Sequence, residues 1–355
     1  MGDFIFSMDS HVVEPKGLWQ DNLPTKFKDR ALRSERRDGY IVFVADNTDL
    51  GRMQIGDGVS GNEKIGGNNP ELRIKDMAKD GINGEVIYPN LGMMSFIMQD
   101  GELSLACMQA YNDWLMKTFG DYPDVFVPTA MLPMREVSET LDEFKRVVGL
   151  GYRSVMLPVQ AVGTIKYNNP ILDPVWEYAA SKRIPLSFHV STGLQTVQER
   201  GPGAAVINYV KVGLASEDLI AYLVCGGTLD RFPELQVITV EAGASWLGAL
   251  CERMDESYQA HHYYVKPKLS MLPSEFVRRQ VKATFQFDRA CLISRNVTGH
   301  EALVWASDYP HMEGTFPYSQ QAIEKLFAGL DVPSHVRADI LGGTAAKLFG
   351  LKAAA

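Results

Sequence analysis

The sequence FIFSMDSHVVEP, residues 4–15, places an apolar run directly before three side chains that can bind a metal ion. The run has the length and apolar content of a buried strand. Asp9, His11 and Glu14 follow it closely. Because alternate residues of a strand point to the same face, Asp9 and His11 can reach one ion from the strand's end. A turn at Asp9 that His11 caps is the simpler alternative, and the rest of the chain decides between the two.

Seven further runs of this kind recur along the chain. They are EVIYPN (85–90), VFVPTAML (125–132), YRSVMLPV (152–159), IPLSFHV (184–190), LQVITVEA (235–242), VKATFQF (281–287) and ALVWASDY (302–309). The segments between them carry apolar residues at three- and four-residue steps, which indicates amphipathic helices. Eight apolar strands that alternate with helices predict a (β/α)8 TIM barrel. A doubly wound open sheet is the alternative, but no G-x-G-x-x-G follows the first strand.

The segment from about residue 32 to residue 73 departs from this alternation. It is rich in Gly, Asn and charged residues, and it is too long for an ordinary loop between a strand and a helix. We expect an insert after the first strand that extends over the barrel mouth and contains a small hairpin at YIVFV (40–44). A disordered insert is the alternative. The whole chain, 1–355, then forms one barrel domain with this insert.

The composition argues against several classes of protein. The chain has 355 residues, of which 46% are hydrophobic and 22% charged, so a large core is expected. Its formal net charge of −8 and the absence of a basic run argue against nucleic-acid binding. No apolar stretch reaches the ~18 residues of a membrane helix. The N-terminus lacks the basic start of a signal peptide, so we expect a cytoplasmic protein with reduced cysteines.

Side chains that bind metals follow four of the expected strands. Besides Asp9 and His11, these are His189 in the fifth run, Glu241 in the sixth, and Asp308 and His311 at the eighth. Taken alone, each of these residues also fits a turn, or a buried core position where its polar atoms are hydrogen-bonded. In a barrel, however, the C-terminal strand ends meet at one mouth. Carboxylates and imidazoles suit Zn, Mn or Fe, and the absence of thiolates argues against a structural zinc cluster. We therefore predict a divalent metal site there.

The candidate ligands exceed the number that one ion needs. They are Asp9, His11, Glu14, His189, Glu241, Asp308 and His311. One ion takes about four to six donors, so the set permits a second ion that shares a bridging carboxylate. Glu14 fits a first-turn helix charge equally well, and His311 fits a residue that faces the substrate. Candidates for substrate contacts, each of which fits a structural role as well, are Thr192, Tyr309 and Trp246.

Five segments resemble the amidohydrolase superfamily, in particular the branch of aminocarboxymuconate-semialdehyde decarboxylase and related aromatic-acid decarboxylases. They are DSHVVEPKGLW (9–19), RIKDMAKDGINGEVIYPNLG (73–92), PLSFHVSTG (185–193), VEAGASWLGALCERMD (240–255) and WASDYPHMEGTFPYS (305–319). The resemblance covers roughly residues 4–350 and implies a (β/α)8 barrel with a divalent metal. By motif match it implies ligands at Asp9, His11, His189 and Asp308. It also implies that Asp308 handles a proton.

Two positions depart from the pattern of that branch. Asp9 stands where the first motif usually has His or Glu. Glu241 stands where the decarboxylases have a His that acts as general acid and base. A glutamate there can transfer a proton with a raised pKa, or it can bind or bridge metals. The fourth run continues into MLPVQA, so we expect no carbamylated lysine.

These features predict a metal-dependent enzyme that acts on a small organic substrate, carboxylated or cyclic. The reaction is either hydrolysis by metal-activated water or decarboxylation, with Asp308 or Glu241 as general base. The site is expected to hold one or two ions. A non-heme di-iron or Mn/Fe monooxygenase is the alternative, and it predicts uptake of dioxygen. A binding subunit without metal is a further alternative. The resemblance is compatible with a homodimer as the oligomeric state.

Overall fold

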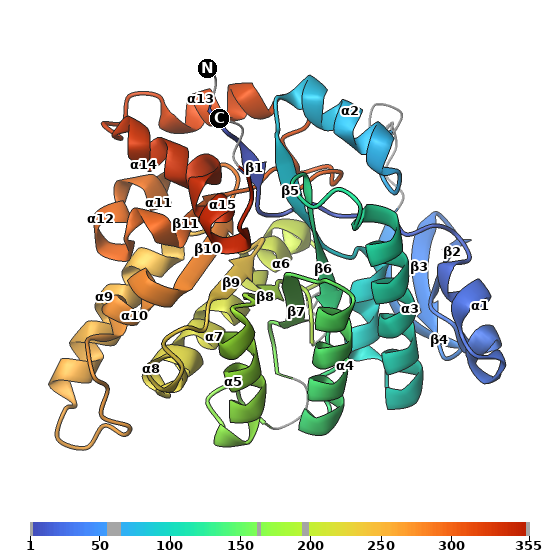
Figure 1. Cartoon of the computed structure of the whole chain (residues 1–355), viewed down its shortest axis with the longest axis horizontal. Helices are drawn as coiled ribbons and strands as arrows, with labels where there is room; N and C mark the ends of the chain where they lie inside the picture. Colours follow the sequence, from blue (N-terminus) through green and yellow to red (C-terminus); the bar gives the residue numbers. More distant parts are fainter. Residues whose placement is uncertain (1–2, 55–64, 162–164, 194–198, 353–355) are drawn as a thin grey trace.

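A barrel of eight parallel strands forms the centre of the protein (Figure 1). The structure is a computed structural model that describes residues 3–54, 65–161, 165–193 and 199–352. The barrel strands are β1 (Phe6–Ser7), β5 (Gly84–Ile87), β6 (Phe126–Met131), β7 (Ser154–Pro158), β8 (Leu186–His189), β9 (Val237–Val240), β10 (Val281–Phe285) and β11 (Leu303–Trp305). They pair in sequence order, and each overlaps one of the eight predicted runs. The predicted (β/α)8 barrel is confirmed.

The first and last strands close the sheet into a barrel. Just beyond their ends, the backbone N–H of Asp308 donates to the carbonyl of Asp9 at 2.9 Å. The backbone N–H of Ser307 donates to the hydroxyl of Ser7 at 2.8 Å. These bonds join residues about 300 positions apart and exclude the open sheet. They also bring two of the predicted ligands, Asp9 and Asp308, side by side.

Helices surround the barrel. The longer ones are α2 (Pro70–Asp80), α3 (Gly101–Phe119), α4 (Val137–Gly149), α5 (Asp173–Lys182), α6 (Ala204–Val212), α7 (Leu214–Cys225), α9 (Ser245–Ala260), α10 (Pro273–Gln280) and α13 (Ser319–Phe327). The shorter ones are α1 (Leu18–Asn22), α8 (Thr228–Arg231), α11 (Arg289–Ile293), α12 (Arg295–Thr298), α14 (Ser334–Ala338) and α15 (Thr344–Phe349). Short 3₁₀ helices lie at η1 (Thr25–Arg30), η3 (Leu91–Ile97), η4 (Pro170–Leu172) and η5 (His300–Ala302), and a π-helical segment lies at η6 (Asp339–Gly343). Within the described ranges, no helix combines the length and apolar content that crossing a membrane requires.

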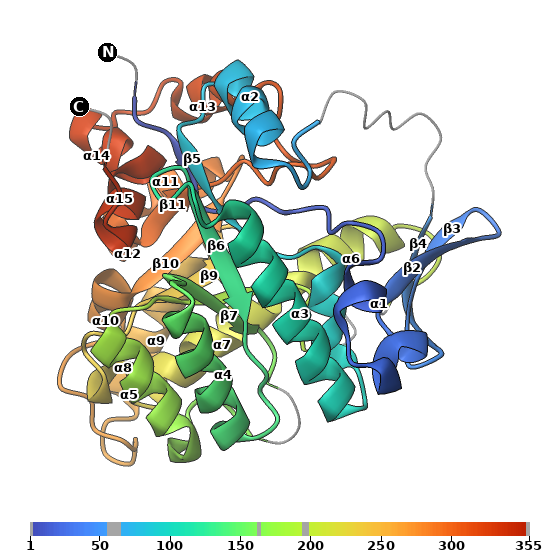
Figure 2. The same ribbon diagram turned by 45° about the vertical axis from the view of Figure 1, so that its right-hand side comes forward.

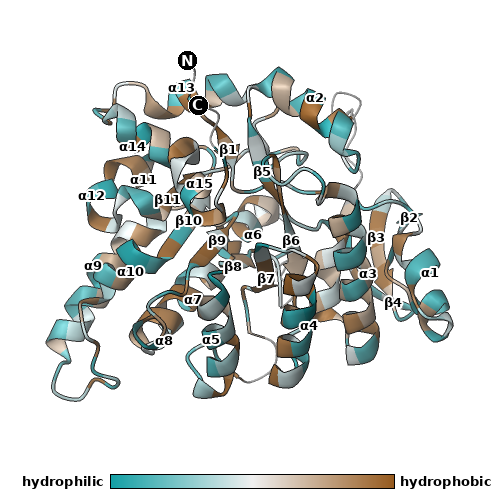
Figure 3. Cartoon of the chain, in the orientation of Figure 1, coloured by the Kyte–Doolittle hydropathy of each residue, from teal (hydrophilic) through white to brown (hydrophobic). Residues whose placement is uncertain are grey.

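Burial explains why the barrel strands read as continuous apolar runs. Every residue of β6, β9 and β10 is buried, as expected for strands with side chains inside the barrel and helices outside it. Figure 3 shows hydrophobic residues on inner elements such as β9, whereas helices such as α4 carry both hydrophobic and hydrophilic residues. Helix α4, for example, buries Phe144 and Val147 in the main apolar core.

The insert forms a separate antiparallel sheet of three strands. They are β2 (Arg33–Arg37), β3 (Tyr40–Ala45) and β4 (Thr48–Gln54). The hairpin predicted at 40–44 is therefore present, with a third strand added. The sheet lies beside α1 and α3 on one flank of the molecule (Figure 2), where Ala45 and Leu103 belong to a second apolar core. The described part of the insert is thus folded, and residues 55–64 lie outside the described residues.

A lysine is buried at the start of β10, away from the predicted ligands. The side chain of Lys282 is 6% exposed. Its Nζ lies 3.3 Å from the carbonyl of Val281 and 3.5 Å from the Oε1 of Gln236. Burial lowers the pKa of Lys282 to about 8. The folded protein therefore binds this proton less tightly than the unfolded chain does, and the charged form destabilises the fold.

We expect Lys282→Met to raise the free energy of unfolding at pH 7 by roughly 2 kcal/mol, because it removes the buried charge. The destabilisation by the ammonium is complete below the folded pKa of about 8 and vanishes above the ordinary value of 10.5. The gain should therefore shrink as the pH rises between these values. Urea denaturation at several pH values measures it, with the exposed Lys145→Met as control. A gain that does not change with pH would contradict the assignment.

Candidate metal and active site

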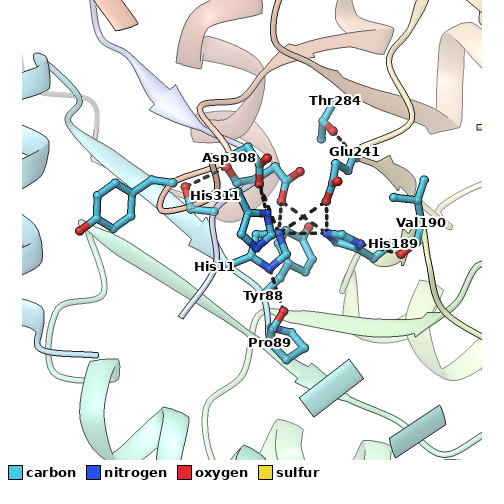
Figure 4. Close-up of polar contacts among 12 residues, drawn as sticks. His11, Tyr88, Pro89, His189, Val190, Glu241, Thr284, Asp308 and His311 are labelled. Atoms are coloured by element: carbon cyan, nitrogen blue, oxygen red, sulfur yellow. Dashed lines mark hydrogen bonds and ion pairs between the residues drawn. The ribbon is translucent and has the colours of Figure 1, made fainter. Parts of the chain in front are cut away.

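Six of the seven predicted ligands gather at the C-terminal ends of the barrel strands. His189 is the last residue of β8, and Glu241 follows β9 directly. Figure 4 shows His11, His189 and Glu241 directed toward one another. Glu241 and Asp308 have φ angles of 62° and 55°, a conformation that is uncommon for residues other than glycine. Such backbone is kept where the surrounding structure enforces it, typically at functional sites.

The imidazoles of His11 and His189 face each other in the buried mouth of the barrel. Their Nδ1 atoms lie 2.8 Å from the carbonyl of Pro89 and 2.9 Å from that of Val190, respectively. A carbonyl oxygen only accepts hydrogen bonds, so each Nδ1 carries a proton. In the neutral imidazoles, both Nε2 atoms then present lone pairs. These two atoms are 3.2 Å apart, a distance at which the lone pairs repel unless a cation or a proton lies close to both.

Three carboxylates surround the Nε2 of His11. The nearest oxygens of Asp9, Asp308 and Glu241 lie 3.5, 3.5 and 3.7 Å from it. Among the described residues, Asp9 Oδ1 and Asp308 Oδ2 are buried and accept no hydrogen bond. Burying an ionised carboxylate without a compensating charge is costly. The cluster therefore fits a divalent cation, because it combines uncompensated oxygens with imidazole lone pairs that point inward.

The donor atoms form two overlapping groups, each with all its atoms within 4.8 Å of one another. The first contains Asp9, His11, His189 and Glu241, and the second contains His11, Glu241, Asp308 and His311. His11 has one free nitrogen and can bind only one ion. The carboxylate of Glu241 has two oxygens and is suited to lie between two ions. The resemblance implies that Asp308 and His189 are ligands of the same site. The distances between donor atoms instead place Asp308 in the group that contains His311.

Burial and the crowding of charges shift the pKa values of this cluster. Burial, with help from Asp308 and Asp9, raises the pKa of Glu241 to about 8. Burial and the neighbouring imidazoles hold the pKa of His11 well below its usual range. Burial lowers the pKa values of His189 and His311, but nearby carboxylates outweigh it and raise both to about 9. Without a metal ion, protons on these two imidazoles supply the positive charge that the carboxylates require.

Glu14, the seventh predicted ligand, does not join the cluster. Its carboxylate accepts backbone hydrogen bonds from Asn90 at 2.9 Å, Leu91 at 3.1 Å and Gly92 at 2.8 Å. These three amides lie at the start of η3, where free N–H groups favour an anion. Glu14 therefore holds the loop after β5, and it lies outside both groups of donor atoms.

Thr192 and Trp246, predicted to contact substrate, make internal hydrogen bonds instead. The Oγ1 of Thr192 donates to the carbonyl of His189 at 2.5 Å and accepts from the N–H of Val159 at 2.8 Å. The Nε1 of Trp246 donates to the carbonyl of Gly243 at 2.8 Å. Thr192 is fully buried, so it supports the backbone at His189. The structure favours the structural alternative for both residues.

A buried ion pair behind His11 was not predicted from the sequence. The guanidinium of Arg73 donates to the carboxylate of Glu85 and, at 2.6 Å, to the carbonyl of His11. It also lies over the ring of Tyr309, 4.7 Å from the ring centre. The hydroxyl of Tyr309 donates to Asp76 Oδ2 at 2.6 Å. Tyr309, the third predicted substrate contact, therefore supports the site from behind.

A cavity of about 440 Å³ opens beside the cluster. Asp9 and Glu241 form its polar end, and the backbone N–H of Glu241 donates to the Oγ1 of Thr284 at 2.8 Å. The rest of the wall comes from the end of α6 and from residues at the ends of β9, β10 and β11: Tyr209, Val210, Val212, Gly213, Ala242, Gly243, Phe285, Gln286, Phe287, Asp288 and Ala306. Sequence reasoning missed this wall, although the apolar segment AAVINYVKV of α6 was a signal for it.

A (β/α)8 barrel with carboxylates and imidazoles at its C-terminal mouth defines a metal-dependent hydrolase or lyase. The family model described as Amidohydrolase matches residues 67–351. The chain belongs to this family. The recognition made from the sequence motifs is thereby confirmed.

Several solved structures share the fold along the whole chain. An amidohydrolase from Mycobacterium avium subsp. paratuberculosis K-10 has a TM-score of 0.81 at 20% identity and covers 99% of this chain and 100% of its own. 5-Carboxyvanillate decarboxylase from Sphingomonas paucimobilis has a TM-score of 0.71 at 19% identity, with 99% and 100% covered. A dihydroxybenzoic acid decarboxylase from Polaromonas sp. JS666, with bound manganese and the inhibitor 2-nitroresorcinol, has a TM-score of 0.67 at 17% identity, with 99% and 98% covered.

Proposed function

We propose that this protein is a metal-dependent hydrolase of a small organic substrate, with a divalent ion at the mouth of the barrel held by Asp9, His11 and His189. The observation that carries the proposal is the pair of Nε2 atoms 3.2 Å apart, with both Nδ1 atoms committed to carbonyls. A divalent cation that binds both imidazoles would account for this arrangement, and a proton on His189 accounts for it when no ion is bound. Manganese or zinc suits the mixed nitrogen and oxygen donors.

When bound, such an ion supplies a Lewis acid that activates water and polarises a substrate carbonyl. The residues of the chain provide the rest of the chemistry. The carbonyls of Pro89 and Val190 fix the orientation of the two imidazole ligands. The side chain of Glu241 is 16% exposed and lies between these ligands and the cavity. We assign it the transfer of a proton from the attacking water to the leaving group, a role that its raised pKa suits.

Asp308 and His311 form a second group that handles protons. The Nδ1 of His311 lies 2.9 Å from Asp308 Oδ1, and the two rings of His311 and His11 are stacked with their centres 4.0 Å apart. Asp308 thus orients His311 at the edge of the metal group, and we assign the pair to proton exchange with solvent. Together with Glu241, the same residues offer donors to a second ion.

Decarboxylation is the second candidate, because two of the similar solved structures named above are decarboxylases. Release of carbon dioxide from an aromatic acid would identify it. Glu241 argues against it, because the resemblance implies that the decarboxylases carry a histidine at this position. The monooxygenase hypothesis and the assignment of iron rest on the resemblance and on the carboxylate-rich ligand set, and none of the comparisons supports them.

Metal binding tests the proposal directly. We expect chelator-treated protein to take up about one equivalent of Zn²⁺ or Mn²⁺ tightly. A concentration about 100 times the dissociation constant should stabilise the fold by ~2.7 kcal/mol, visible as a higher melting temperature. Mg²⁺ and Ca²⁺, which prefer oxygen ligands, serve as controls and should have much smaller effects. If neither Zn²⁺ nor Mn²⁺ binds or shifts the melting temperature, the proposal is wrong.

A further inference from the structure

The cavity beside the cluster offers no positive side chain to a ligand. Among the described residues that line it there is no lysine, arginine or histidine. Its acidic members are Asp9, Glu241 and Asp288. Asp288 is occupied, since its Oδ2 accepts the backbone N–H groups of Ala244 at 2.8 Å and Ser245 at 2.7 Å. An anionic ligand therefore cannot form an ion pair with a side chain of this wall.

The metal cluster adds to this bias. Three carboxylates, those of Asp9, Glu241 and Asp308, lie around the Nε2 of His11. Two of them, Asp9 and Glu241, also form the polar end of the cavity. A substrate carboxylate bound there would face these carboxylate oxygens, and like charges repel more strongly in a buried site than in water. An uncharged substrate meets no such penalty.

The rim and the wall of the cavity indicate what else the ligand carries. Tyr209 and Val210 on α6 are 56% and 68% exposed, and Phe287 after β10 is 58% exposed, although all three line the cavity. Helix α6 buries no residue of its own. Exposed apolar residues around a cavity are typical of ligand sites. Gln286 lines the same wall, and a side-chain amide is a group that can donate a hydrogen bond to a carbonyl of the ligand.

We propose that the site binds an uncharged substrate with an apolar or aromatic body and a carbonyl group, such as an ester or an amide, and that it discriminates against aromatic carboxylates. The inference deepens the proposed function and rests on it for the reaction. The preference itself concerns binding, so it is measurable without turnover. Gln286 is the residue that we assign to recognition of the neutral carbonyl.

Two probes of the same shape test the preference. 2-Naphthamide and 2-naphthoate share one ring system and differ in charge. We expect 2-naphthamide to bind the Zn²⁺-loaded protein at least about tenfold more tightly in isothermal titration calorimetry, a difference of about 1.4 kcal/mol. Equal or tighter binding of 2-naphthoate would overturn the inference, and so would the absence of binding by either probe at millimolar concentration.

Variants of Gln286 test its role. Gln286→Arg places a cation on the wall and should improve the binding of 2-naphthoate at least about tenfold. Gln286→Met, similar in length and uncharged, should weaken the binding of 2-naphthamide without improving that of 2-naphthoate. If Gln286→Arg leaves both affinities unchanged while its melting temperature shows a folded protein, the assignment of Gln286 is wrong.

The same samples separate this inference from the proposed function. Zinc content, measured in each sample, reports on the metal site alone. If the protein binds no Zn²⁺ but still binds 2-naphthamide more tightly than 2-naphthoate, the proposed function is wrong and the inference about the binding preference stands. If the protein binds Zn²⁺ but binds 2-naphthoate more tightly than 2-naphthamide, the metal site is supported and the inference about the binding preference is wrong.

Discussion

His11→Ala is expected to abolish tight metal binding, with a loss of affinity well above 100-fold and a matching loss of turnover. The Nε2 of His11 lies 3.2 Å from that of His189 and within 3.7 Å of a carboxylate oxygen of Asp9, Asp308 and Glu241. No other donor in the cluster has so many neighbours of this kind. Loss of an outer-shell partner alone costs about 10–100-fold in metal affinity, so loss of this central ligand must cost more.

Metal content and the melting temperature with and without Zn²⁺ measure the effect. His262→Ala is the control, because His262 is exposed and should bind Zn²⁺ like the unchanged protein. Asp9→Asn is a second variant, which removes a ligand charge with little change in shape and should also weaken binding strongly. One equivalent of zinc with unchanged affinity in His11→Ala would show that the ion, if any, binds elsewhere.

Arg73→Met is expected to destabilise the fold by about 3–5 kcal/mol, because it leaves a buried carboxylate without its partner. Arg73 and Glu85 have side-chain exposures of 0% and 1%. The substitution also removes the hydrogen bond to the carbonyl of His11, so metal affinity should fall as well. Urea denaturation and zinc titration measure the two effects. The exposed pair of Arg253 and Glu256 provides the control, because Arg253→Met should cost less than about 1 kcal/mol.

The double variant Arg73→Met/Glu85→Leu separates the ion pair from simple loss of packing. Removing both charges eliminates the unpaired carboxylate, so the double variant should be more stable than Arg73→Met alone. Its metal affinity should stay reduced, because the bond to His11 is still missing. Stability losses that simply add would contradict the description of Arg73 and Glu85 as one unit.

The barrel and the metal group were predictable because they depend on local patterns and one general rule. Apolar runs such as 184–190 and 235–242 identify buried strands by composition alone. The rule that barrel chemistry lies at the C-terminal strand ends then brings His189 and Glu241 to one place. No knowledge of side-chain packing is needed for either step.

The remaining features depend on contacts that periodicity does not encode. Glu14 and Asp9 look equivalent in the sequence, yet Glu14 bonds the amides at 90–92 and Asp9 faces the other ligands. Arg73 and Glu85 both lie in the segment 73–92 that resembles the family. Their pairing depends on how α2 packs against β5, which the sequence pattern does not encode. A polar side chain has several partners within reach along a folded chain, and only the tertiary structure selects one.

The closure of the barrel by hydrogen bonds between its first and last strands has a consequence for synthesis on the ribosome. Asp9 and His11 leave the exit tunnel about 300 residues before Asp308, whose backbone N–H bonds to the carbonyl of Asp9. The nascent chain therefore holds Asp9 and His11 without Asp308 until the last strand of the barrel has been made. A product that terminates before residue 303 would lack β11 and, with it, Asp308 and His311 of the second donor group.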